Sequence, residues 1–268
     1  MSRTSSAISS DEVGPDEAPL VALIHGTMDR STGMLKLSRR LDSRLRVLRY
    51  DRRGYGRSTP HVGPFDMVAQ VDDLICLLSG RPVVLVGHSY GGNVALAAAS
   101  RYPELICGVA IYETPLSWQP WWPGTTAGAA ARATGADPAD AAELFIRRLI
   151  GDSAWEALPE RTRQIRRGEG TAMVAELRDL QANEPWLAGD ISCPVVASYG
   201  SLGAKHHRDG MTFVHDHLPN SELIELVGCR HDAPLSHSDV FSSMIVDPLL
   251  RRAGGHWARA VSSPFMAP

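Results

Sequence analysis

A single serine stands where a buried strand would end and a helix would begin. The apolar run at residues 82–87 leads into Gly87-His88-Ser89-Tyr90-Gly91, and an alanine-rich segment, residues 92–101, follows. A turn this sharp strains the backbone at the serine and leaves no room for side chains beside it, so glycines flank it. The pattern G-x-S-x-G in this context predicts that Ser89 presents its hydroxyl as a nucleophile at the carboxyl edge of a sheet.

A nucleophilic serine needs a base, because its hydroxyl is weakly reactive until a neighbouring group accepts the proton. His231 is the candidate, since it lies in a glycine-containing segment after the last apolar run. His237, six residues later, is the alternative base. His88 lies within the serine turn, where we expect it to pack and to form hydrogen bonds.

The elements that would position these residues alternate along the chain. Helical patterns such as residues 67–78 and 92–101 separate short apolar runs, and this alternation predicts a mostly parallel sheet with helices on both faces. The strand-like runs are residues 20–26, 46–51, 82–87, 108–113, 194–200 and 222–228.

One long interval lacks strand-like runs. Residues 116–189 carry apolar side chains at helical spacing, for example Phe145, Ile146 and Leu149, which predicts an inserted helical lid. The polar start of the chain predicts a disordered arm. The expected division is an arm at 1–18, an α/β core at 19–115 and 190–252, the lid at 116–189 and a tail at 253–268.

Composition excludes several classes of protein. The 268 residues carry a formal net charge of -3, which gives no electrostatic footprint for nucleic acid. No apolar run approaches the roughly 18 residues that span a bilayer, and the first residues do not resemble a secretory signal. The four cysteines lack metal-ligand spacing, so we expect buried thiols in a reducing compartment. We therefore expect a cytoplasmic protein with no nucleic-acid or membrane partner and an undetermined oligomeric state.

Three further stretches, together with the serine turn, resemble the α/β-hydrolase superfamily. LIHGTMD at residues 23–29 looks like the H-G-x turn of that family, and YDRRGYGRS at 50–58 looks like its D-x-R-G-x-G-x-S loop. VGCRHDAPLSHSD at 227–239 looks like its late G-x-x-H segment. The resemblance covers residues 20–250 and implies an α/β-hydrolase fold. Because only 19 polar residues precede the first of these strands, we expect about six strands rather than eight.

The resemblance also assigns roles. The order serine then histidine is that of the fold, which supports His231 as the base. The backbone N–H groups of Thr27 and Tyr90 would form the oxyanion hole, in which each donor is typically worth about 3 kcal/mol. His25 would support the loop of Thr27, and Asp51, with the arginines that follow it, would hold the next loop in place.

The triad acid departs from the family pattern. Most relatives carry an aspartate three or four residues after the glycine that ends the penultimate strand, where this chain has Leu-Gly-Ala at 202–204. Glu113, at the end of the strand after the serine helix, is our first candidate for the acid. Asp209 is the second, although it resembles a helix N-cap. Asp232 neighbours His231, and adjacent residues rarely face each other.

Three tryptophans open the predicted lid. Trp118, Trp121 and Trp122 would pack the lid on the core and line an apolar substrate pocket. Four histidines gather between residues 206 and 217, but their spacing is not that of a known metal site, so we expect neither metal nor cofactor.

The sequence therefore predicts a serine hydrolase that cleaves a carboxylic ester, lactone or related acyl bond of a small to medium apolar substrate through an acyl-enzyme. Carbon–carbon hydrolases and cofactor-free haloperoxidases share these residues and stay open as alternatives. The other alternative is a non-catalytic binder of small molecules on the same fold, which the missing acid would explain.

Overall fold

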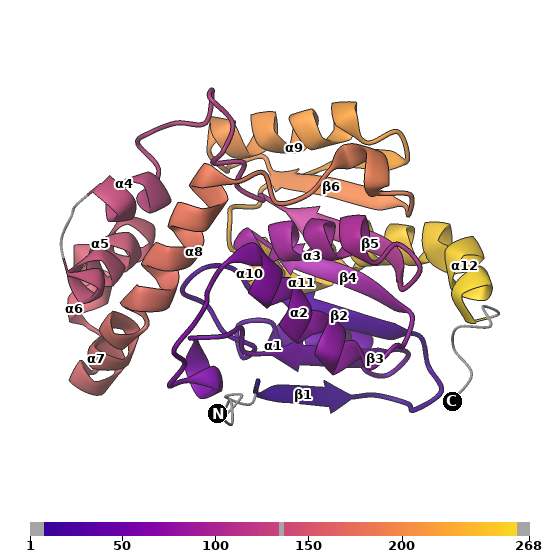
Figure 1. The fold of residues 1–268 in the computed structure, drawn as a ribbon, viewed down its shortest axis with the longest axis horizontal. Coiled ribbons are helices and arrows are strands. Elements are labelled where there is room, and N and C mark those ends of the chain that lie inside the picture. Colours follow the sequence, from indigo (N-terminus) through magenta and orange to yellow (C-terminus); the bar gives the residue numbers. More distant parts are fainter. Residues whose placement is uncertain (1–7, 134–136, 262–268) are drawn as a thin grey trace.

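A mostly parallel sheet of seven strands forms the centre of the molecule (Figure 1). The computed structural model describes residues 8–133 and 137–261. The strand order is β1-β3-β2-β4-β5-β6-β7, and every neighbouring pair except β1 and β3 is parallel. The six predicted strands are all present, as β2 (Leu20–Ile24), β3 (Arg46–Tyr50), β4 (Val83–His88), β5 (Ile106–Tyr112), β6 (Val195–Gly200) and β7 (Ser221–Leu226).

The seventh strand corrects the prediction of a disordered arm at residues 1–18. β1 (Ser10–Val13) pairs antiparallel with β3 at the edge of the sheet; residues 1–7 lie outside the described part of the chain. Its sequence, SDEV, is mostly polar: Val13 packs on the core, and ion pairs hold the acidic residues of the strand in place. Glu12 accepts hydrogen bonds from Arg46 and Arg81, and Asp11 pairs with Arg57. Such a strand has no apolar signature in the sequence.

Helices cover both faces of the sheet, as predicted. Alternate side chains of each strand point to opposite faces, so Ala22 and Ile24 pack in one cluster while Val21 and Leu23 pack in the other. On the first face lie α2 (Met67–Leu78), α3 (Tyr90–Arg101) and α9 (Lys205–His217). On the second lie α1 (Leu35–Leu41), α10 (Ala233–Ser236), α11 (Ser238–Phe241) and α12 (Asp247–Val261). Short 3-10 turns lie at Gly56–Ser58 and Ala188–Asp190, and a π-helical stretch, Ser242–Val246, joins α11 to α12.

The end of the chain is also more regular than predicted. α12 continues through residues 253–261, which the sequence suggested to be a tail, because Leu249 and Ala253 pack beneath Gly108 of β5. Residues 262–268 lie outside the described part.

Cys76 is exposed, contrary to the expectation that all four cysteines are buried; the other three are buried. Among the helices of the described residues, none is both long and apolar enough to cross a membrane.

Five helices follow β5 before the chain returns to the sheet at β6: α4 (Ala127–Ala133), α5 (Pro138–Ile150), α6 (Asp152–Glu156), α7 (Glu160–Gly168) and α8 (Gly170–Ala182). These inserted helices lie at the carboxyl ends of the parallel strands (Figure 1). Their own core includes Phe145, Trp155 and Met173, and it also takes in Met28 and Tyr55 from the loops after β2 and β3. The insertion is therefore packed onto the edge of the sheet that carries Ser89.

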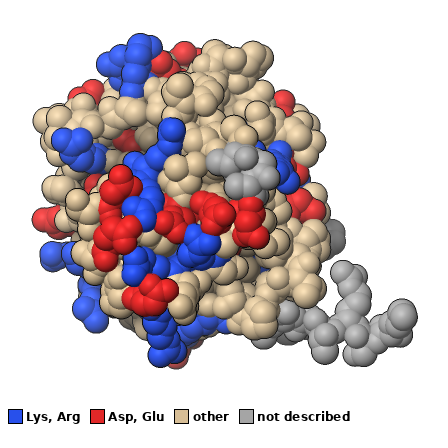
Figure 2. All heavy atoms as spheres, turned by 90° about the vertical axis from the view of Figure 1, so that its left-hand side faces the viewer, with Lys and Arg blue, Asp and Glu red and all other residues tan. Residues whose placement is uncertain are grey.

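The face formed by the inserted helices carries intermingled acidic and basic side chains (Figure 2). Arg147 contacts Glu143, Asp152 and Glu156, and Arg167 contacts Asp140 and Glu143. The charges of these two arginines are thus neutralised locally.

Candidate active site

Ser89 occupies a strained turn between β4 and α3. Its φ is 53° and its ψ is −124°, a conformation that is rare for residues other than glycine. The turn has no room for a side chain two residues before or two residues after the serine. A Cβ at Gly87 would lie 2.4 Å from the carbonyl oxygen of Gly91, and a Cβ at Gly91 would lie 2.3 Å from that of Ile24. The predicted serine turn is therefore present, and Ser89 is partly exposed.

Two backbone N–H groups adjoin this serine. Tyr90 begins α3, so its N–H has no partner within the helix. Thr27 follows Gly26, which lies so close to the serine that a Cβ there would be 3.0 Å from Ser89 Cβ and 3.5 Å from its Oγ. No residue in the described part of the chain accepts a hydrogen bond from either N–H. Both N–H groups are therefore without an acceptor among the described residues.

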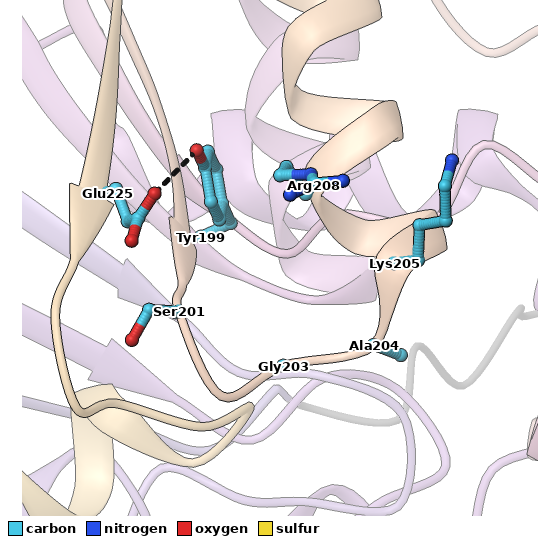
Figure 3. A pocket seen from close by; sticks show the side chains of 8 residues that line it. Tyr199, Ser201, Gly203, Ala204, Lys205, Arg208 and Glu225 are labelled. Atoms are coloured by element: carbon cyan, nitrogen blue, oxygen red, sulfur yellow. Dashed lines mark hydrogen bonds between the residues drawn. The ribbon is translucent and has the colours of Figure 1, made fainter.

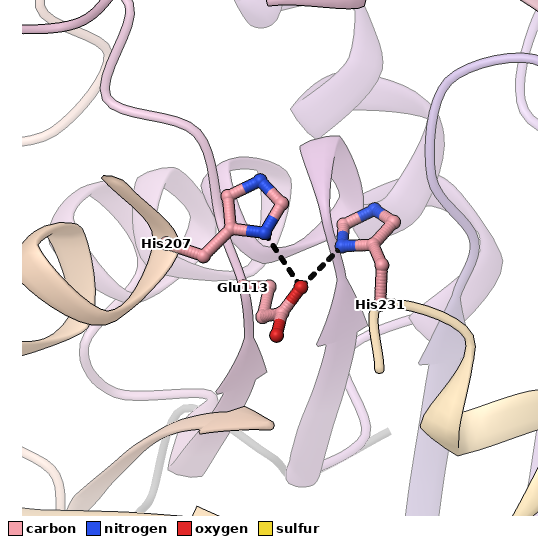
Figure 4. A group of neighbouring side chains, drawn as sticks. All are labelled: Glu113, His207 and His231. Atoms are coloured by element: carbon pink, nitrogen blue, oxygen red, sulfur yellow. Dashed lines mark hydrogen bonds and ion pairs between the residues drawn. The ribbon is translucent and has the colours of Figure 1, made fainter. Parts of the chain in front are cut away.

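The carboxylate of Glu113 is buried at the end of β5. Its backbone N–H donates to the carbonyl of Ser198 (2.9 Å), and its Oε1 accepts the N–H of Gly200 (3.0 Å). Its Oε2 lies 2.7 Å from His231 Nδ1 and 2.6 Å from His207 Nδ1 (Figure 4). One buried oxygen therefore contacts two histidines that come from different elements.

This geometry fixes the tautomers of the two rings. A carboxylate only accepts hydrogen bonds, so Nδ1 of both His207 and His231 carries a proton. Burial raises the pKa of Glu113, but the hydrogen bonds from His207 and His231 outweigh it and hold this pKa below its usual range. Burial also lowers the pKa of His207. In the neutral rings, Nε2 is left with a lone pair that can accept a proton.

The loop that lacks the usual aspartate makes room for Glu113 instead. A Cβ at Gly203 would lie 2.3 Å from Glu113 Oε1, so the glutamate occupies the space that a side chain at this position would need. The same loop borders a polar hollow of about 290 Å³, lined among others by Lys205 and by Tyr199, whose hydroxyl donates to Glu225 at 3.0 Å (Figure 3). The loop thus forms one wall of the hollow, and its Gly203 lies next to the carboxylate of Glu113.

The alternative acids lie elsewhere. Asp209 is not the N-cap of a helix, as its sequence suggested, because α9 begins four residues earlier at Lys205; the two side chains form an ion pair within the helix. Asp232 is exposed. His237 was the alternative base, and its ring contacts the hydroxyl of Ser236.

His88 supports the loop of His231. Its Nε2 lies 2.8 Å from the carbonyl oxygen of His231, so Nε2 donates the hydrogen bond. Burial lowers the pKa of His88 to about 3, which keeps the ring neutral. This is the packing and hydrogen-bonding role that the sequence suggested.

A buried ion pair fixes the loop that carries Thr27. Arg52 donates to the carbonyl oxygens of His25 (3.0 Å) and Gly26 (3.1 Å), and its guanidinium pairs with Glu176 of α8 at 2.6 Å. Glu176 also accepts the hydroxyl of Thr27 at 2.7 Å. Both charged side chains are almost fully buried. The inserted helices are therefore tied directly to the backbone beside Ser89.

The neighbouring loop is held by charge, as predicted. Asp51 accepts the backbone N–H groups of Ser31 (2.7 Å) and Arg57 (2.8 Å). Arg53 forms a two-pronged pair with Asp73, with both distances 2.7 Å. His25 donates from Nδ1 to the carbonyl of Gly26 and accepts the N–H of Arg52 at Nε2, which is the supporting role expected of it.

The three tryptophans of the insertion have different surroundings. Trp118 packs edge-on against Trp186, with ring centroids 5.7 Å apart, and Trp121 packs on Phe213 of α9. Trp122 stacks near His207, with centroids 6.2 Å apart. Of the three tryptophans, Trp122 is thus the one that lies next to His207, which contacts Glu113.

Known proteins share this architecture. A model of the alpha/beta hydrolase family matches residues 21–244. The chain belongs to this family. Pimeloyl-(acyl-carrier protein) methyl ester esterase of Chromobacterium violaceum is 27% identical over 248 residues, which are 88% of this chain and 96% of that protein.

Solved structures of alpha/beta hydrolases confirm the fold. A thermophilic esterase from Thermogutta terrifontis has a TM-score of 0.70 and 24% identity, with 92% of this chain and 93% of that chain covered. The enol-lactonase of Burkholderia xenovorans has a TM-score of 0.68 and 22% identity, with 91% and 96% covered. The predictions of an alpha/beta hydrolase fold and of a hydrolase are confirmed at this level.

The structure brings Glu113 and His231 together, and places Ser89 beside Thr27 and Tyr90. Sequence reasoning missed His207, which it grouped with the three other histidines of α9. The signal that could have identified it is its place in the sequence: His207 follows closely after the Leu-Gly-Ala stretch in which the usual acid is absent.

We expect Glu176→Gln to destabilise the alpha/beta hydrolase by about 3–5 kcal/mol, because it leaves the buried guanidinium of Arg52 without a countercharge. Urea unfolding measures this loss. The matched control is Glu156→Gln, which removes an exposed partner of Arg147 and Arg163 and should cost less than about 1 kcal/mol. Equal effects of the two substitutions would show that the buried pair does not anchor the insertion.

Proposed function

We propose that this alpha/beta hydrolase is a serine hydrolase that cleaves a carboxylic ester, lactone or related acyl bond through an acyl-enzyme. The observation that carries the proposal is the hydrogen bond of 2.7 Å between His231 Nδ1 and the buried carboxylate of Glu113. It leaves Nε2 of His231 as a base, which is the arrangement that activates a serine.

In the first step, Ser89 Oγ attacks the carbonyl carbon of the substrate while His231 Nε2 accepts the hydroxyl proton. The ring then carries a positive charge, which the adjacent carboxylate of Glu113 stabilises. The negative charge on the carbonyl oxygen is stabilised by the N–H groups of Thr27 and Tyr90, each worth about 3 kcal/mol where such donors are preorganised.

The second half repeats this chemistry with water. His231 returns its proton to the leaving alcohol oxygen, and the acyl group stays on Ser89. The ring then takes a proton from water as that water attacks the acyl carbon, and it returns this proton to Ser89 Oγ when the bond to the serine breaks and the acid is released. These steps use only side chains and backbone groups of the chain, so the proposal calls for no cofactor.

The substrate pocket is proposed to lie between the core and the inserted helices, which would act as a lid. Trp122 adjoins His207, and Trp118 has a buried indole N–H without a partner in the described residues. With Trp121 they offer apolar surface with a polar group for orientation. The names of the relatives, a methyl ester esterase and an enol-lactonase, support an ester or a lactone as the substrate.

A non-catalytic binder on this fold was favoured by the missing aspartate. That argument loses its force because Glu113 fills the space beside Gly203 and contacts the histidine.

A fluorophosphonate probe should label the wild-type protein once, because such probes react with serines that a base activates. Intact mass measures the adduct. Ser89→Ala should abolish labelling, whereas the control Ser236→Ala, at an exposed serine, should label like the wild type. Folded wild type that takes up no probe would contradict the proposal and would favour the binder.

Glu113→Gln should lower kcat for a chromogenic acyl ester by about 10⁴-fold, the loss seen when a triad acid becomes an amide. The amide also disturbs the tautomer of His231, since it can donate as well as accept. Asp209→Asn, which alters the other candidate acid, should change kcat less than about twofold. If Asp209→Asn were the slower variant, the assignment of the acid would be reversed.

A further inference from the structure

Two histidines and one carboxylate meet at a single point next to the proposed triad. Glu113 lies at the end of β5, His207 in the first turn of α9 and His231 in the loop after β7 (Figure 4). One potential ligand atom of each lies within 4.8 Å of the others. Only the pair Glu113 and His231 is needed for the proposed reaction, so the presence of His207 calls for a separate explanation.

The donor set is one that divalent transition metals prefer. Two imidazole nitrogens and one carboxylate oxygen bind Zn²⁺ in open sites, with metal–ligand distances of about 2.0–2.2 Å. Ligand atoms on a tetrahedral ion are then about 3.3 Å apart. In the structure Glu113 Oε2 lies 2.6 Å from His207 Nδ1 and 2.7 Å from His231 Nδ1. Small side-chain rotations would increase these two separations to the value that a tetrahedral ion requires.

The surroundings already orient the three side chains. Glu113 Oε1 is held by the N–H of Gly200, and the ring of His207 packs against Trp122 and His206. His231 is about a third exposed, which gives an ion access from solvent. Such outer contacts fix the direction of metal ligands in proteins.

We propose that Glu113, His207 and His231 bind one divalent transition-metal ion of the zinc type, and that the bound ion inhibits the enzyme. Each histidine binds through Nδ1, so its single proton moves to Nε2 and no proton is lost from the ring. His231 then has no lone pair at Nε2 with which to take the proton of Ser89. The carboxylate of Glu113, bound to the ion, no longer faces the ring.

Binding and inhibition are tested separately, because inhibition rests on the proposed function whereas binding does not. Isothermal titration calorimetry with Zn²⁺ should show one site in the wild type and in Ser89→Ala, which keeps all three ligands. His207→Gln should weaken binding more than about tenfold, since even the loss of an outer contact costs about 10–100-fold. His217→Gln, an exposed histidine at the other end of α9, is the matched control and should bind like the wild type.

For inhibition, the rate of fluorophosphonate labelling is measured with and without Zn²⁺ for the wild type and for His207→Gln, each relative to its own metal-free rate. Zn²⁺ should slow the wild type more than about tenfold and a chelator should restore it, whereas His207→Gln should be slowed much less. Equal binding by wild type and His207→Gln, or no binding, would overturn the site. Binding without slower labelling would overturn the inhibition, and absence of labelling without metal would instead refute the proposed function.

Discussion

The carboxylate of Glu113 is the group around which half of the site is built. A buried charge costs several kcal/mol unless donors surround it, so the chain must deliver such donors to the end of β5. They come from three separate segments: the end of β6 supplies the N–H of Gly200, α9 supplies His207, and the loop after β7 supplies His231. Satisfying one carboxylate thereby fixes the positions of three segments that are distant in sequence.

A second buried charge organises the other side of Ser89. Arg52 and Glu176 neutralise each other, and their remaining hydrogen-bonding atoms hold His25, Gly26 and Thr27. Because Glu176 belongs to α8, this ion pair links the inserted helices to the backbone beside the serine. The strained serine turn thus lies between two buried, fully partnered carboxylates, and this environment can hold a conformation that an isolated turn would not keep.

The sequence predicted those parts whose signal is local. The six apolar strands and the serine turn follow from runs of neighbouring residues, and the structure has them at nearly the expected bounds. β1 was missed because Val13 is its one apolar residue and ion pairs with Arg46 and Arg81 supply much of its stabilisation. The contact between His207 and Glu113 was missed for a related reason, since 94 residues separate the two and no spacing rule connects them.

The central claim is that Glu113 Oε2 accepts a hydrogen bond from Nδ1 of both His207 and His231. Imidazole ¹H–¹⁵N correlation spectra of protein with labelled histidines test it directly, with His207→Gln used to assign the two rings. The account predicts that both neutral rings carry their proton on Nδ1 with downfield-shifted signals, and that both signals disappear in Glu113→Gln. A His231 ring that is protonated on Nε2, or signals that persist in Glu113→Gln, would contradict it.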